Sequence, residues 1–185
     1  MEPIFAFERD GKLYPFALRQ EMVKQMSSLK KKFLYYKDYA NKSIDQMFDP
    51  SLIDKATHLN FSESRTSLLI NEGTKGLSLR ALPIEAQFSP VYGVTLTDID
   101  KDKDLDIVMG GNLFAVKPEV GRYDAMKGLV LRNEGANTFV PLSGTESGIV
   151  VRGEIRHIKP LQSKSGKMFA FVRNNNSIVF YKPRK

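Results

Sequence analysis

The stretch that decides the fold is Asp98-Ile-Asp-Lys-Asp-Lys-Asp-Leu-Asp106, in which an aspartate stands at every second position. Carboxylates at this density repel one another. A hard cation such as Ca²⁺, which takes about six to eight oxygen ligands, is the usual reason for a loop to contain them. We therefore interpret the stretch first as a metal-binding loop. The alternative is a charged turn that is solvated and binds no metal.

The segments on either side predict strands. Val91–Thr97 before the loop and Leu105–Met109 after it are apolar and rich in β-branched residues, and the second ends at Gly110-Gly111. Runs of this composition bounded by glycine are typical of strands. The loop is therefore expected to join two strands, whereas the loop of an EF-hand joins two helices.

The expected metal is Ca²⁺, bound by oxygen ligands from this one loop. Four aspartates are predicted to bind it through their side chains and a fifth through its backbone carbonyl. The four are Asp98, Asp100, Asp102 and Asp106, and the fifth is Asp104.

Two lysines within the loop predict weak binding. Lys103 occupies the sixth position, where a tight Asp-rich loop favours glycine because the backbone has a positive φ. Lys101 stands between two of the predicted ligands. Both ammonium groups lower the local negative charge that attracts the cation.

The residues around the loop resemble a known repeat. Phe88–Asn112 is similar to an FG-GAP/VCBS repeat, the calcium-loop repeat of integrin-type β-propellers. Other segments resemble the C-terminal part of large bacterial secreted proteins that contain such repeats and often an ASPIC/UnbV region. These segments are Lys12–Phe16, Leu29–Phe33, Leu82–Pro90, Val116–Leu131 and Phe171–Asn176. The resemblance implies a parent protein that is secreted, periplasmic or at the cell surface.

An internal repeat supports a repeated architecture. Leu68–Gly73 followed by Leu77–Pro83 parallels Val130–Gly135 followed by Thr138–Leu142, at an offset of about sixty residues. In both copies an apolar run reaches Asn-Glu-Gly, a turn signal, and a second apolar run follows. We expect outer hairpins of two successive blades, with the Asp loop joining the inner strands of the second blade.

The expected fold is mainly β with a helical insertion, and forms a partial β-propeller of about three blades of antiparallel sheet over residues 1–185, with the calcium-loop repeat at about 88–144. A hairpin opens the first blade and three strands form the third. These elements are Ile4–Phe7 and Lys12–Tyr14 around Asp10-Gly11, then Glu154–Pro160, Met168–Arg173 and Ile178–Tyr181. Because propellers typically close with at least about four blades, the chain looks like the C-terminal piece of a longer protein, and its open sheet edges favour self-association.

The helical insertion is expected at about residues 17–57. An apolar stripe predicts a mostly helical segment over Leu18–Tyr39. The stripe consists of Met22, Met26, Leu29 and Phe33. It fits core packing better than a partner surface. Ser43 is expected to cap a helix over Ile44–Phe48, and Pro50 fits the first turn before Ser51–Ala56.

Charge opens an alternative function. The formal net charge is +7, and aromatic residues lie among basic ones, as in surfaces that contact phosphate and stack bases. The residues concerned are Lys30–Lys32, Phe33, Tyr35, Tyr36, Lys37 and Tyr39, with a basic tail of Lys182, Arg184 and Lys185. The competing interpretation is a solvated helix face with aromatic residues that pack.

Other classes have less support. His58 and His157 are far apart, no Gly-x-Ser-x-Gly is present, and the absence of cysteine excludes thiol chemistry. The first residues do not form a signal peptide, and no stretch is long enough to span a membrane. We expect a non-catalytic calcium-binding module for protein or glycan interaction at the cell surface. The alternatives are a nucleic-acid-binding module and part of a glycan-processing enzyme whose catalytic domain lies elsewhere.

Overall fold

Strands make up most of the regular structure, and all of the sheets are antiparallel. The structure is a computed structural model that describes residues 3–118, 120–164 and 166–184. The chain divides into two units, Met1–Phe61 and Ser62–Lys185. The expected mainly β fold with helices near the N-terminus is confirmed. None of the described helices combines the length and apolar character needed to cross a bilayer.

The first unit begins with a hairpin. Strand β1 (Ala6–Arg9) pairs with β2 (Lys12–Pro15), close to the predicted positions. Asp10 and Gly11 connect them with φ values of 52° and 71°. Positive φ at both central residues is the property of a type I′ turn, which explains the Asp-Gly pair.

The segment Leu18–Tyr39 is mostly helical, as expected, and its helical residues are divided among three short helices. The first ends where Met26 adopts extended backbone angles, and the second ends at Phe33, whose φ of −120° and ψ of 77° also lie outside the helical region. The two helices predicted to follow are confirmed with slightly shorter bounds. The five helices are α1 (Arg19–Gln25), α2 (Leu29–Lys32), α3 (Tyr36–Tyr39), α4 (Ile44–Met47) and α5 (Pro50–Asp54).

The apolar stripe of this unit forms its core, as predicted. Met22, Leu29 and Phe33 are buried together with Met47 of α4, and Met26 packs against them partly buried. The breaks between the short helices let residues from separate helices converge, which one straight helix does not allow.

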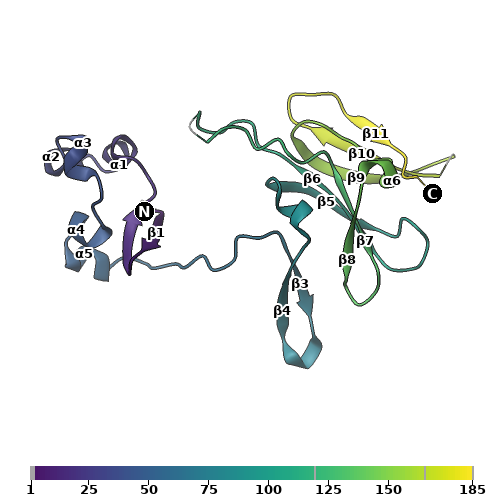
Figure 1. Cartoon of the computed structure of the whole chain (residues 1–185), viewed down its shortest axis with the longest axis horizontal. Coiled ribbons are helices and arrows are strands. Elements are labelled where there is room, and N and C mark those ends of the chain that lie inside the picture. Colours follow the sequence, from purple (N-terminus) through teal and green to yellow (C-terminus); the bar gives the residue numbers. More distant parts are fainter. Residues whose placement is uncertain (1–2, 119, 165, 185) are drawn as a thin grey trace. The chain divides into compact units, whose positions relative to one another are not determined.

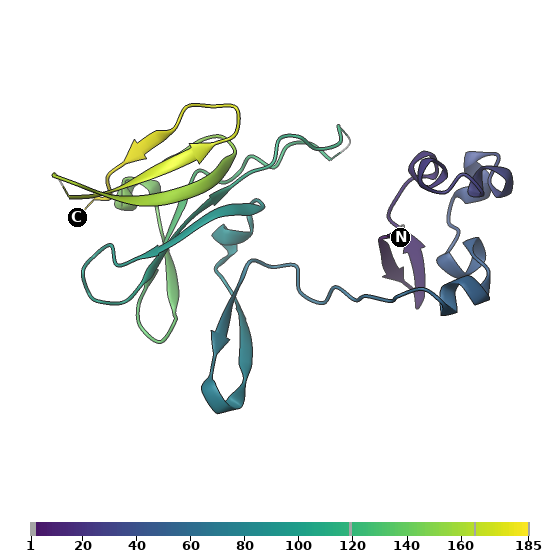
Figure 2. The same ribbon diagram turned by 180° about the vertical axis from the view of Figure 1, so that it is seen from behind.

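The described residues of the second unit form three sheets, whose arrangement is drawn in Figures 1 and 2. The largest is a four-stranded meander in which the strands pair in chain order, β5-β6-β7-β8. The next three strands form a sheet of order β11-β10-β9, and β3-β4 is a separate hairpin. The strands are β3 (Ser67–Asn71), β4 (Leu77–Ala81), β5 (Val91–Thr97), β6 (Asp106–Gly111), β7 (Leu129–Asn133), β8 (Phe139–Leu142), β9 (Ile155–Ser163), β10 (Gly166–Arg173) and β11 (Val179–Tyr181). Short helices η1 (Gly73–Lys75), η2 (Ile84–Gln87) and α6 (Gly144–Ser147) lie between them.

The two larger sheets share the main core. One face of the meander contributes Val108 and Val130, and the three-stranded sheet packs against it through buried aliphatic and aromatic side chains. These are Ile155, Ile158, Phe169 and Phe171. Gly110 lies close to the three-stranded sheet, since a Cβ at this position would overlap the side chain of Ile155.

The other face of the meander has a second, smaller core. Ile107, Met109 and Leu131 are buried there against Ala86 of η2. On the same face, Val94 and Leu96 of the edge strand β5 remain half exposed. The hairpins and strands predicted from the internal repeat are therefore present, and the sheets of the described residues do not close into a barrel. The expected partial propeller of about three blades over residues 1–185 stays a prediction.

Candidate metal centre

The Asp loop joins neighbouring strands, as expected. Strand β5 ends at Thr97 and β6 begins at Asp106, and these two residues are opposite each other in the pairing register. The flanking strands bring the two ends of the loop together and so restrict the conformations of the residues between them. A strand-to-strand loop of this kind provides a defined frame for ligands from one short segment.

Three of the predicted ligands converge. One carboxylate oxygen from each of Asp98, Asp100 and Asp106 lies within 4.8 Å of the others. Asp106 is buried, Asp98 is partly exposed and Asp100 is exposed. Oxygens at this separation can approach a cation of the size of Ca²⁺, whose oxygen ligands lie at about 2.3–2.6 Å.

Asp106 anchors the loop to the sheet. Its Oδ2 accepts a hydrogen bond from the Ile99 backbone N–H (2.7 Å), and its Oδ1 accepts one from the Asn133 backbone N–H of β7 (2.9 Å). These bonds satisfy a buried carboxylate that would otherwise be costly to desolvate. They also fix the Asp106 carboxylate on the side of the loop that faces the protein interior.

Asp98 folds the first half of the loop. Its two carboxylate oxygens accept backbone hydrogen bonds from Lys101 (2.6 Å) and Lys103 (3.2 Å). Lys101 and Lys103 have φ values of 73° and 81°. The loop therefore needs the left-handed conformation at both lysines, which is the conformation that favours glycine.

Asp102 and Asp104 lie outside the converging trio in the described part of the chain. The Asp102 Oδ1 accepts a hydrogen bond from the Asp104 backbone N–H at 2.8 Å, and Asp100 Oδ1 accepts one from the Asp102 N–H at 3.3 Å. These bonds are Asx turns, which hold a polar loop whether or not a metal binds. The ligand roles of Asp102 and of the Asp104 carbonyl stay predictions, and so does the alternative of a metal-free turn.

Lys167 is a residue that sequence reasoning missed. Its Nζ, from strand β10, donates hydrogen bonds to the Asp98 backbone carbonyl (2.7 Å) and to the Thr97 hydroxyl. The neighbouring sheet thus holds the first residue of the loop. No sequence signal identifies this contact, because the partners are about seventy residues apart.

A second polar cluster lies around Glu154, which is buried. Its carboxylate accepts hydrogen bonds from the Phe114 backbone N–H (2.8 Å), Arg156 (2.7 Å) and Asn174 (2.9 Å). The Phe114 bond and then the Asn174 bond lower the pKa of Glu154 below its ordinary value. Because Phe114, Arg156 and Asn174 all come from the chain itself, we interpret the cluster as a structural link. It connects the long loop after β6 to the β11-β10-β9 sheet.

Two of the residues considered for nucleic-acid binding, Tyr39 and Lys32, make contacts within the first unit. The Tyr39 hydroxyl donates to the Ala17 carbonyl (2.6 Å), and its ring packs edge-on against Phe33. Lys32 Nζ donates to the Met47 carbonyl (2.9 Å). Tyr35 and Tyr36 remain exposed. Of the basic tail, Arg184 bonds the Thr145 carbonyl, and Lys185 lies outside the described residues.

Comparisons of the chain with models of protein families, with curated proteins and with solved structures found no match.

Proposed function

We propose that the chain is a non-catalytic calcium-binding repeat module of the FG-GAP/VCBS type, and part of a β-propeller that binds a protein or glycan at the cell surface. The observation that carries the proposal is the convergence of Asp98, Asp100 and Asp106 at a turn between adjacent strands. The Asn133 N–H bond ties this turn to the next strand of the same meander.

The sheets are compatible with propeller blades. Propeller blades are four-stranded antiparallel sheets, and β5-β6-β7-β8 is such a sheet with its strands in chain order. The following sheet packs on one of its faces through the shared core. The repeated hairpins also share a local detail, because Gly73 and Gly135 each donate their N–H to the asparagine two residues earlier.

The weak site suits an extracellular location. Lys101 and Lys103 lower the local negative charge, and we expect a dissociation constant of roughly 10⁻⁴–10⁻³ M, the range of extracellular calcium modules. Such a site binds calcium where the ion is present at about millimolar concentration. This argument agrees with a parent protein that is secreted, periplasmic or at the cell surface.

Calorimetric titration with CaCl₂ tests the proposal. The wild-type chain should bind calcium in the range given above, and Asp100→Asn should weaken binding at least about tenfold because it removes one of the converging charges. Asp104→Asn is the matched control, in the same loop but outside the trio, and should bind nearly as the wild type does. If the wild type binds no calcium at millimolar metal, the loop is a metal-free turn.

The second candidate function is nucleic-acid binding, and one observation favours it. Lys37 Nζ lies 5.6 Å from the centre of the exposed Tyr35 ring, an arrangement that can combine base stacking with a phosphate contact. A steep loss of RNA affinity with rising salt, together with no calcium binding, would favour this function over the first.

A further inference from the structure

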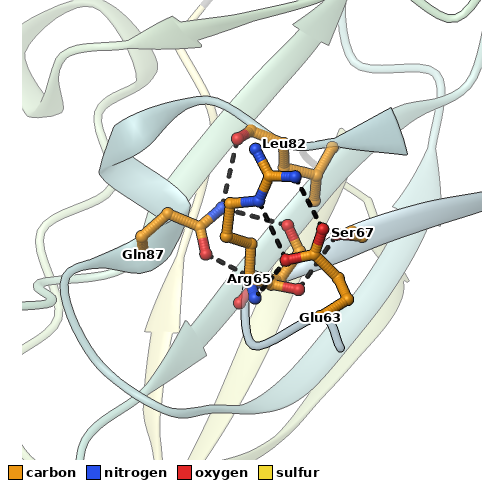
Figure 3. Close-up of polar contacts among 6 residues, drawn as sticks. Glu63, Arg65, Ser67, Leu82 and Gln87 are labelled. Carbon is orange, nitrogen blue, oxygen red and sulfur yellow. Dashed lines mark hydrogen bonds and ion pairs between the residues drawn. The ribbon is translucent and has the colours of Figure 1, made fainter. Parts of the chain in front are cut away.

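The β3-β4 hairpin is held firmly at its base. The Gln87 side chain of η2 accepts the Thr66 N–H (2.7 Å) and donates to the Thr66 carbonyl (3.0 Å). It also donates to the Leu82 carbonyl (3.1 Å), as Figure 3 shows. At the same end of the hairpin, Arg80 Nη1 donates to the carbonyls of Ala136 and Asn137 in the β7-β8 turn (both 3.3 Å). The hairpin is thus attached at its base.

The β7-β8 hairpin shows how this repeated element is completed. On the far side of β7 from β8, Leu131 pairs with Ile107 of β6, and the Asn133 N–H donates to Asp106 at the start of β6. Leu131 is fully buried as a result. The sequence repeat aligns Leu69 with Leu131 and Asn71 with Asn133.

In the described residues, the edge of β3 that faces away from β4 is unpaired, whereas the corresponding edge of β7 pairs with β6. The Leu82 N–H donates to the Thr66 carbonyl and the Glu72 N–H donates to the Gly76 carbonyl. Because hydrogen-bonding groups alternate along an antiparallel strand, the backbone groups of Leu69 and Asn71 point away from β4. Within the described residues, β3 pairs with β4 alone, and the N–H groups of Leu69 and Asn71 have no partner.

The side chains next to this edge form an uncovered apolar face. Leu69 and Leu79 are opposite each other in the register, with Leu77 beside them on the same face. Their exposed fractions are 60%, 54% and 65%, whereas Leu131 in the completed copy is 0% exposed. The two copies therefore differ in what covers them, while their strand sequences remain alike.

We propose that the edge of β3 binds a β-hairpin of the β5-β6 type from a different protein and not from a second copy of this chain, in which β6 already pairs with β5 and β7. The added strand runs antiparallel to β3, carries apolar side chains at alternate positions and places a carboxylate at the N–H of Asn71, as Asp106 does at Asn133. Edge strands with free N–H and C=O groups bind further strands in this way. The inference rests on the repeat architecture of the proposed function and is independent of calcium binding.

Amide hydrogen exchange of the isotopically labelled full chain tests the proposal, with a synthetic peptide of residues 90–112 as the probe. We expect exchange at the Leu69 and Asn71 amides to slow at least about tenfold when the peptide binds, because the new strand occupies these donors. A peptide with Asp106→Asn should bind more weakly. Unchanged exchange at both amides with about 1 mM peptide would overturn the proposal, since it excludes even weak binding.

Two variants of the chain complete the experiment. Leu69→Glu places a charge on the apolar face and should abolish peptide binding, whereas Leu59→Glu changes another exposed leucine and should leave it intact. Sedimentation of the chain without peptide tests whether a second copy of the chain binds this edge instead. A dimer that Leu69→Glu dissociates would assign the edge to a second copy and overturn the proposal. Because Leu69→Glu leaves the Asp loop unchanged, its calcium titration separates a failure here from a failure of the calcium proposal.

Discussion

At the residue scale, Lys103 stands where the backbone favours glycine. Its φ of 81° lies in the left-handed region, and its N–H bonds the Asp98 carboxylate. Lys103→Gly should raise the free energy of unfolding by about 1 kcal/mol, because glycine adopts this conformation without a Cβ penalty. Denaturant unfolding measures this change.

The same substitution should also tighten calcium binding. It removes a positive charge near the trio, and the expected gain in affinity is about threefold at an exposed site. Lys103→Ala is the control, because it removes the charge and keeps the Cβ. We expect it to tighten calcium binding without the gain in stability. Equal stability of the two variants would contradict the strain argument.

Glu63 is the second residue with a specific prediction. Hydrogen bonds from the Arg65 side chain (2.9 and 2.6 Å) and from the Arg65 N–H lower its pKa from 4.5 to about 2 (Figure 3). A depressed pKa means that the pair stabilises the folded state above pH 4.5 and that this contribution is lost as the pH falls from 4.5 to about 2. An NMR titration of the Glu63 carboxyl should give this low pKa.

The variant Arg65→Gln provides the control for Glu63. It removes the charged partner, so the pKa of Glu63 should return toward its ordinary value. A Glu63 pKa that stays near 4.5 in the wild type would show that the pair does not form in solution.

At the scale of elements, α2 shows that a run of three lysines is not uniform. Lys30, Lys31 and Lys32 are exposed, yet only the Lys32 Nζ bonds a backbone carbonyl, that of Met47 at the end of α4. Lys32→Gln should lower the free energy of unfolding by about 1 kcal/mol through the loss of this bond. Lys30→Gln and Lys31→Gln should each change it by less than about 0.5 kcal/mol. Urea unfolding of the three variants compares these values, and equal effects would contradict a specific tie between α2 and α4.

The elements also show where local patterns predict well. Asp10-Gly11 and the repeated Asn-Glu-Gly segments give hairpins at the expected places. The stripe from Met22 to Phe33 was correctly predicted to be core, but its helix is broken. Apolar spacing identifies which side chains are buried. Apolar spacing does not reveal short interruptions of a helix, because the side chains on either side of such an interruption can still face the same core.

At the scale of the whole molecule, the division into two units makes calcium a selective probe. With a dissociation constant of about 1 mM, 10 mM calcium should stabilise the unit that contains the Asp loop by about 1.4 kcal/mol. We expect its thermal midpoint to rise by about 5 °C, while the unit formed by Met1–Phe61 stays unchanged. Differential scanning calorimetry with and without calcium measures both. A shift of both transitions would show that the units unfold together.

The sequence by itself determined the strand-loop-strand arrangement around the Asp loop, the repeated hairpins and the apolar stripe of the first unit. Each depends on residues close together in the chain, through turn chemistry, side-chain alternation and spacing. Only the tertiary structure decided that Asp98, Asp100 and Asp106 converge, that Asn133 and Lys167 hold the loop, and that β3 keeps an open edge. These features depend on strands that are distant in the chain, and local propensity does not specify which distant backbone groups meet.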